Sequence, residues 1–484
     1  MNQPHFHSAS VSKPLADFIV RIQFDDLDTE TIRMATQCLK DAIGVSIAAS
    51  TLGEGCQAFA NIVDVTTNLE CTLLGFSKKT SSVEAAWVNG ALAHALDFED
   101  AHDKTLTHPN AAIVAALLSA AEKKLPNNDR CLFSGKQFIT AMVLGCEIVC
   151  RLARGLDQPL DDFGWYPPPI LGAFGAAAAV AKLYKLNEIQ IINAFSIVLC
   201  NVSCSAEIKY NPESSVRAIR DAFSAQIGLQ AVLLAMQGVT GFEFPFEGKA
   251  GFYQNFARGK YSAERVVEGL VVGDKAGKKL INFEIKHISF KAWPSCRGTH
   301  AFIEAAIALM KSHKIKVDDI QSVEAKGCRI NKMLAEPIES KQSPKSAIDA
   351  KFSIPFTVAV AIVYGDVTLD NFLPDSLKDE RVLSVSSKIS FEVDHDLDDS
   401  PKNMTTGYLS IATVNGKHVS VTISEPYGAV SRPLSKQSID KKFRSCCQYA
   451  ASTITKKNTD KLIEIIDSLD GERNLSDNFF PLLG

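Results

Sequence analysis

The feature that most constrains the fold is a change in hydrophobic spacing just past the middle of the 484-residue chain. From about residue 12 to 265, apolar residues recur at helical spacing, and short loops with Gly, Pro or Asn separate the runs. Strand-like alternation is not convincing anywhere in this part, so the pattern predicts an all-helical domain. The clearest helical runs are 31–50, 109–124, 135–153 and 221–238.

The second half of the chain instead shows alternation with period two. It occurs in 320–328, 384–393 and 408–423, and Asn415-Gly416 lies between two β-rich arms of the last segment. An Asn-Gly pair in that position is a strong hairpin signal. Apolar helical runs such as 345–365 lie between the first two strands, which favours a smaller α+β domain.

The predicted fold is therefore mainly α, with a large all-helical domain and a smaller α+β lid. We place the helical domain at 14–265 and the C-terminal region at 280–455, with the lid at about 280–428. Further helices at 435–470 are expected to pack back on the helical domain, which would make the lid an insert.

Composition excludes several classes of protein. A hydrophobic content of 46% is ordinary for a globular chain, and the formal net charge of −4 argues against nucleic-acid binding. The N-terminus lacks a secretory signal pattern, and the best apolar run, 170–186, is short and interrupted by lysines. Twelve cysteines without a paired framework are typical of a reduced protein. We expect a cytoplasmic location and no membrane or nucleic-acid partner.

The most distinctive short stretch is 94-HALDFEDAHDKTLTHPNAA-112, with three histidines and four carboxylates before an apolar helical run. His108 precedes a proline suited to the first turn of a helix, so its side chain should lie at that helix's N-terminus. A helix–loop–helix turn can bring Asp97 to it. The pair would then be an orienting carboxylate and a proton-transferring imidazole.

Two other interpretations of this stretch stay open. One is a solvated loop in which His108 only caps the helix. The other is a metal site, which is disfavoured because His94, His102 and His108 lack HxxxH spacing and do not share a helical face. From the residues alone we therefore predict no metal site in this stretch.

Three further segments gather groups suited to an acidic ligand. An aromatic pair and three prolines place Tyr166 near the start of an Ala-rich helix, and 216–222 puts two arginines on one face if helical. The third segment, 290–306, gathers a lysine, a cysteine, an arginine and a histidine at the entry to another helix. Aromatic packing, surface ion pairs and a structural thiol are the alternatives for these groups. Together they predict a pocket for a small polyanionic acid. The candidate binding residues are Arg217, Arg220, Lys291, Cys296 and His300.

Taken in order, 89-NGALAHALDFED-100, 107-THPNAA-112, 164-GWYPPPILGAFGAAAA-179 and 290-FKAWPSCRGTH-300 resemble the MmgE/PrpD family, and the resemblance runs from about residue 14 to 455. That family includes 2-methylcitrate dehydratase, cis-aconitate decarboxylase and iminodisuccinate epimerase. The resemblance implies a helical domain with a smaller α+β lid, a homodimer, and no required metal or cofactor.

The resemblance also assigns residues. Asp97 and His108 match the acidic and histidine positions of the family, while Lys291 and His300 match its F-K-x-x-P-x-x-x-x-T-H segment.

The sequence also departs from the family pattern. Tyr166 stands where many relatives have histidine, Arg217 and Arg220 stand where lysine and histidine are frequent, and Ala101 replaces a threonine. These departures argue against cis-aconitate decarboxylase activity in particular.

The expected chemistry is proton abstraction next to a carboxylate. His108 would be the base, oriented by Asp97; the arginines and Lys291 would hold carboxylates, and Tyr166 would donate a proton. We predict a cofactor-independent hydro-lyase acting on a small di- or tricarboxylate. The alternatives are an epimerase or racemase, a decarboxylase, and a catalytically inactive carboxylate-binding relative.

Overall fold

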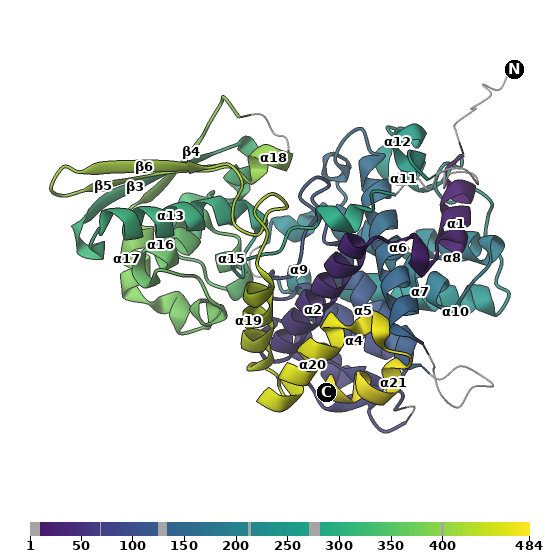
Figure 1. Cartoon of the computed structure of the whole chain (residues 1–484). Coiled ribbons are helices and arrows are strands. Elements are labelled where there is room, and N and C mark those ends of the chain that lie inside the picture. Colours follow the sequence, from purple (N-terminus) through teal and green to yellow (C-terminus); the bar gives the residue numbers. More distant parts are fainter. Residues whose placement is uncertain (1–9, 68, 124–132, 212–213, 271–280, 398–400) are drawn as a thin grey trace, which may run out of the picture.

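The computed structural model describes residues 10–67, 69–123, 133–211, 214–270, 281–397 and 401–484. A large helical body lies beside a smaller body that carries a sheet (Figure 1). This is the predicted mainly α architecture with a smaller α+β part. The expected boundary between the two falls largely on 271–280, outside the described residues, so the exact division stays a prediction.

Buried helices form the centre of the large body. Helices α5 and α7 are apolar on nearly every side, which is typical of helices in the middle of a core. Capping side chains define several starts: Asp28, Ser81 and Ser134 each accept a backbone N–H of the first turn. The main helices are α2 (Thr29–Leu52), α4 (Ser82–His94), α5 (Pro109–Glu122), α6 (Gly135–Arg154), α7 (Pro167–Leu183) and α10 (Asp221–Met236).

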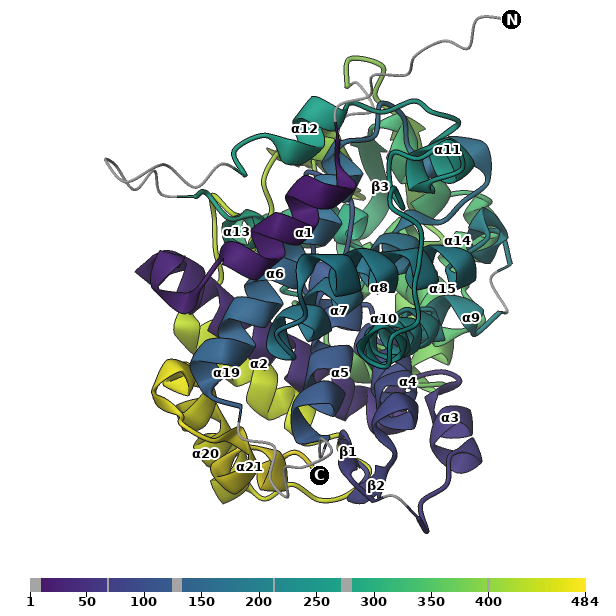
Figure 2. The ribbon, with the colours of Figure 1, turned by 90° about the vertical axis from the view of Figure 1, so that its right-hand side faces the viewer.

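Shorter or peripheral helices complete this body. Helix α1 packs against α8, as the turned view in Figure 2 shows. They are α1 (Ser12–Arg21), α3 (Cys56–Ile62), α8 (Glu188–Asn201), α9 (Val216–Ile219), α11 (Phe252–Ala257) and α12 (Ala263–Val267).

One feature of this body differs from the sequence prediction. A small antiparallel hairpin pairs β1 (Cys71–Leu73) with β2 (Lys78–Thr80), where no strand was expected. Three-residue strands are too short to display alternation, so periodicity has no signal to detect.

The smaller body contains a four-stranded sheet in the order β4-β3-β5-β6. Strand β3 pairs parallel with β4 and antiparallel with β5, and the predicted hairpin at Asn415-Gly416 is confirmed between β5 and β6. Helices α13, α16 and α17 cover one face (Figure 1). The strands are β3 (Ile320–Gly327), β4 (Ile389–Val393), β5 (Gly407–Thr413) and β6 (His418–Ile423). The helices are α13 (His300–His313), α14 (Ile338–Gln342), α15 (Ala347–Lys351), α16 (Ile354–Tyr364), α17 (Glu380–Ser386) and α18 (Pro401–Met404).

The strand expected over 384–393 is only half right. Helix α17 continues to Ser386, and the strand begins at Ile389. Asp379 caps this helix, and Val382 and Val385 are buried three residues apart, which is helical spacing.

The C-terminal helices return to the large body. Helices α19 (Lys436–Cys447) and α20 (Lys456–Asp467) pack against α2, and α21 (Leu475–Asn478) follows them (Figure 2). The buried Lys40 ammonium on α2 lies 2.5 Å from both Asp440 and Asp467. Among the helices described, none combines the length and apolar character that a membrane span requires.

Candidate active site

A short bridge brings two distant chain segments together at the end of α4. Ala101 and Ser289 exchange both backbone hydrogen bonds, at 2.9 and 2.8 Å. This bridge holds the loop between α4 and α5 beside the segment that contains Lys291. Asp97, with a φ of 49°, turns the chain sharply just after α4. His108 is the residue before Pro109, and its side chain makes no capping hydrogen bond.

The first interaction in the site is a buried ion pair. The Lys291 ammonium lies 2.5 Å from the Asp97 carboxylate and 3.7 Å from Glu99, and all three residues are at most 1% exposed. Burial opposes both charges of the pair, but the two groups stabilise each other, so the pKa of Asp97 is lowered and that of Lys291 is raised. The pair is therefore ionised at neutral pH.

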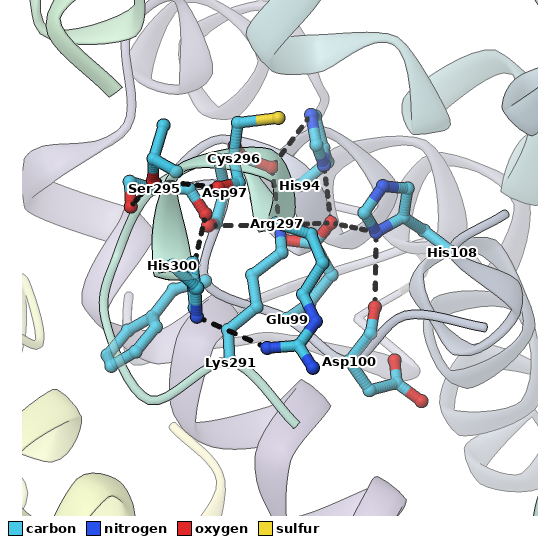
Figure 3. A network of polar contacts seen from close by, with 12 residues as sticks. His94, Asp97, Glu99, Asp100, His108, Lys291, Ser295, Cys296, Arg297 and His300 are labelled. Carbon is cyan, nitrogen blue, oxygen red and sulfur yellow. Dashed lines mark hydrogen bonds and ion pairs between the residues drawn. The ribbon is translucent and has the colours of Figure 1, made fainter. Parts of the chain in front are cut away.

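The second interaction links two imidazoles through Glu99. One carboxylate oxygen, Oε1, lies 2.5 Å from Nδ1 of His94 and 2.9 Å from Nδ1 of His108 (Figure 3). Burial opposes the charge of Glu99, but His94 and Lys291 outweigh it and hold the pKa of Glu99 well below its usual range. An ionised carboxylate only accepts, so both Nδ1 atoms carry hydrogens.

The carboxylate in contact with His108 is therefore not the expected one. Asp97 was expected to orient His108, but it pairs with Lys291, and Glu99 contacts the imidazole instead. The backbone oxygen of Asp100 also lies 3.1 Å from Nδ1 of His108. Nε2 of His108 has no hydrogen-bond partner within the described ranges, and the ring is partly exposed. With Nδ1 protonated, Nε2 presents a basic lone pair.

Arg220 closes the network on the other side. Its Nη1 donates to Nε2 of His94. Burial, together with the Arg220 charge, lowers the pKa of His94 to about 3, so His94 is a neutral link. Nη2 of Arg220 is buried and has no hydrogen-bond partner among the residues described. It is thus a charged donor free to bind an anion.

Tyr166 and Arg217 occupy different places around this network. The Tyr166 ring lies 5.1 Å from the Arg220 guanidinium, and Tyr166 is the residue before α7. Arg217 was expected to share a helical face with Arg220. Helix α9 ends at Ile219, however, and the Arg217 guanidinium lies 3.5 Å from the centre of the Phe352 ring. The two arginines are buried but have separate partners.

Cys296 and His300 border the Lys291 side. Burial raises the pKa of the Cys296 thiol to about 11, so the group is a neutral thiol. Nδ1 of His300 lies 3.4 Å from Arg297, and its Nε2 lies 3.3 Å from the Ser295 backbone oxygen. Burial and the Arg297 charge hold the pKa of His300 well below its usual range. His300 therefore positions the segment as a neutral group and carries no charge for an anion.

Three ligand-type atoms of this network also meet the spacing of a metal site. The nearest ring nitrogens of His94 and His108 and an oxygen of Glu99 all lie within 4.8 Å of one another. The sequence analysis disfavoured a metal at His94, His102 and His108 and did not consider Glu99, because His94 ends α4 whereas His108 precedes α5. Arg220 contacts His94 and Lys291 lies close to Glu99, so two positive charges already surround the position and oppose a further cation.

Sequence reasoning also missed other members of the network. His94 and Glu99 were not selected as catalytic residues, although both lie in the quoted histidine-rich stretch. Asp100 was missed as well; its carboxyl group is buried and accepts a hydrogen bond from Asn110. The available signal was the density of ionisable residues between two apolar helices.

The fold and the site together define a two-domain, mainly helical protein with a buried acid–base network at the end of α4. The MmgE/PrpD N-terminal domain matches residues 13–264, and the MmgE/PrpD C-terminal domain matches residues 293–469. This chain belongs to the MmgE/PrpD family, as its sequence motifs indicated.

Curated relatives of the chain include two kinds of enzyme. The cis-aconitate decarboxylase-like protein oryM of Aspergillus oryzae is 25% identical over 483 residues, which cover 97% of this chain and 96% of that protein. The cis-aconitate decarboxylase of Mus musculus is 24% identical, over 95% of this chain and 91% of the relative. The 2-methylcitrate dehydratase of Escherichia coli K12 is 22% identical, over 72% of each.

Proposed function

We propose that the protein is a cofactor-independent lyase that acts on a small di- or tricarboxylate through a carbanion next to a carboxylate. The observation that carries this proposal is the network itself: a partly exposed imidazole, held by Glu99 through Nδ1, stands beside two buried cations. The relatives support it, because decarboxylases and dehydratases of small acids are both lyases.

In the dehydration that we favour, Nε2 of His108 removes the proton from carbon, and the electron pair forms the new C=C bond. The C–O bond on the neighbouring carbon breaks, and the hydroxyl leaves as water after it takes a proton from an acid. Tyr166 is our candidate for that acid. Glu99 stabilises the imidazolium that forms, as a carboxylate on Nδ1 does in other acid–base sites.

The cations stabilise the negative charge that develops during this step. The free Nη2 of Arg220 is suited to bind one carboxylate of the substrate. Lys291, already ionised by its contact with Asp97, offers a second positive charge that burial strengthens. Because these charges are fixed before the reaction, they need no reorganisation as the carbanion forms.

Decarboxylation is the second candidate. The decarboxylase of Mus musculus and the decarboxylase-like protein of Aspergillus oryzae match 95% and 97% of this chain. The dehydratase of Escherichia coli matches 72% of it. In that reaction an acid protonates an alkene carbon. The C–C bond to a carboxylate breaks, its electron pair forms a new C=C bond, and CO2 leaves. The same cationic pocket would bind the substrate.

One experiment separates these reactions. The protein is incubated in deuterated water with a panel of citrate-like, aconitate-like and amino-diacid substrates, and the products are followed by NMR. Dehydration gives an alkene and retains all carbons, decarboxylation releases CO2, and epimerisation exchanges deuterium with inversion. Tight binding without exchange or turnover of any acid would identify a carboxylate-binding protein and contradict the lyase proposal.

The base is tested on whichever substrate reacts. His108→Ala is expected to lower kcat by about 10²- to 10⁴-fold, the usual contribution of a general base. Glu99→Gln should reduce kcat with little change in KM, because Glu99 acts through His108 and does not touch the substrate. His313→Ala, an exposed histidine on α13, is the matched control. Unchanged turnover in His108→Ala would refute the assignment of the base.

A further inference from the structure

A cavity of about 770 Å³ lies between the two bodies of the molecule. The helical body contributes residues 51–54 and Leu96, and the smaller body contributes residues 343–347, Lys351 and parts of 369–383. This volume is in the range of small-molecule sites. Much of the wall is apolar, formed by Leu52, Leu96, Leu369, Phe372, Leu373, Leu377 and Leu383.

Lys351 is the unusual member of this lining. It is the last residue of α15 and is 2% exposed. Within the described ranges its ammonium makes no hydrogen bond and no ion pair, and its nearest aromatic contact is the Phe372 ring at 5.1 Å. Burial lowers the pKa of Lys351 to about 8. Asp97 and Glu54 attract this charge from a distance, but neither forms an ion pair with it, so a ligand carboxylate can supply the direct partner that a buried ammonium requires.

The cavity adjoins the acid–base network. The backbone oxygen of Lys351 accepts the N–H of Cys296 at 2.9 Å, which places α15 against the segment that carries Lys291. On the opposite wall, Leu96 immediately precedes Asp97. The charge of Lys351 also interacts with that of Asp97. A ligand that reaches Lys351 is therefore next to the proposed reaction site.

Charge around the cavity favours anions. Lys345 and Lys378 are exposed members of the lining, and Glu54 is its one acidic member among the described residues. One oxygen of Glu54 accepts the N–H of Ala347 at 2.8 Å. Three lysines and one carboxylate give the cavity a positive electrostatic potential, although the net charge of the chain is −4. A positive potential of this kind raises the local concentration of anionic ligands.

We infer that this cavity is a subsite for a distal carboxylate of the substrate, and that Lys351 is its counter-charge. The inference rests on the proposed function and narrows the substrate class. The acid carries a carboxylate beyond the unit held by Arg220 and Lys291, so a tricarboxylate fits better than a dicarboxylate. Lys351 then determines the specificity for the third carboxylate and takes no part in proton transfer.

The test measures binding without turnover. Propane-1,2,3-tricarboxylate has neither a hydroxyl group nor an alkene to react, and 2-methylbutanedioate has the same carbon skeleton without one of the terminal carboxylates. Calorimetry at pH 7 is expected to show at least tenfold tighter binding of the tricarboxylate by the wild-type protein. Lys351→Met should abolish that preference, and Lys351→Arg should retain part of it. Lys311→Met, an exposed lysine on α13, is the matched control and should keep the full preference.

The outcomes distinguish this inference from the proposed function. Equal preference in Lys351→Met and the wild type overturns the subsite, as does failure of the wild type to bind the tricarboxylate at millimolar concentration. A Lys351-dependent preference in a protein that turns over no acid upholds the subsite and rejects the lyase. Unfolding by urea shows that the variants are folded. Lys351→Met is expected to be at least as stable as the wild type, because it removes an unpaired buried charge.

Discussion

At the scale of single residues, Asp100 makes the stability of the folded protein depend on pH. Burial, reinforced by the charge of Asp41, raises the pKa of the Asp100 carboxyl to about 8, from an ordinary value of 3.8. Between these values the folded protein holds a proton that the unfolded chain has lost. Stability from this group is therefore complete below about pH 4 and is lost as the pH rises toward 8.

Asp100→Asn should remove this dependence. Urea unfolding between pH 5 and 8 is expected to show a smaller loss of stability in the variant, by a few kcal/mol across the three pH units. Asp162→Asn, which removes an exposed carboxylate, is the matched control and should follow the wild type. Parallel curves for Asp100→Asn and the wild type would mean that Asp100 is already ionised at neutral pH.

At the scale of elements, a tight turn at Gly428 holds the Lys291 segment. The N–H of Phe290 donates to the Gly428 backbone oxygen at 2.9 Å. Gly428 has a φ of 92°, and a Cβ there would lie 2.0 Å from the Phe290 oxygen. Gly416, in the β5–β6 turn, also has a positive φ, but nothing lies within 4 Å of its Cβ position.

These two glycines give a matched pair of variants. Gly416→Ala is expected to cost about 1 kcal/mol, the price of the left-handed conformation alone. Gly428→Ala should cost clearly more, about 3 kcal/mol, and should also reduce turnover because the clash displaces the segment that leads to Lys291. Thermal unfolding and kcat measure the two effects. Equal losses of stability in the two variants would show that the turn yields without strain.

The helices and strands also show how much of this fold can be predicted from the spacing of hydrophobic residues. The long helices and the Asn415-Gly416 hairpin were predictable because each repeats its signal over several residues or has a specific turn pair. The break between α9 and α10 was not, since 216–222 satisfies helical spacing throughout. Which carboxylate meets His108 was also beyond the sequence. Asp97 and Glu99 are two residues apart, and the choice depends on Lys291, almost 200 positions away.

At the scale of the whole molecule, one lysine of the C-terminal helices supports the site. The Lys442 ammonium, on α19, lies 2.6 Å from the Asp41 carboxylate of α2. It also donates to the backbone oxygens of Phe98 and Lys291, at 2.6 and 3.0 Å. A single charge thus joins the end of the chain to both segments that flank the acid–base network. The return of the C-terminal helices therefore fixes both segments that carry the proposed site.

Replacing Lys442 should lower both the stability of the fold and the turnover. Burial raises the pKa of Asp41 even with Lys442 beside it, so Lys442→Met leaves a buried carboxyl with no counter-charge. The expected loss is about 3–5 kcal/mol in urea unfolding at pH 7, with reduced turnover.

The double variant Asp41→Asn/Lys442→Met should recover part of the stability, because the uncompensated charge is gone. It should not recover the turnover, because the backbone oxygens of Phe98 and Lys291 still lack their donor. Lys436→Met removes a largely exposed ammonium on the same helix. Its partners Asp440 and Asp467 keep their ion pairs with Lys40, so this variant should cost at most about 1 kcal/mol. If the double variant were no more stable than Lys442→Met, the loss would come from the backbone contacts and not from the buried charge.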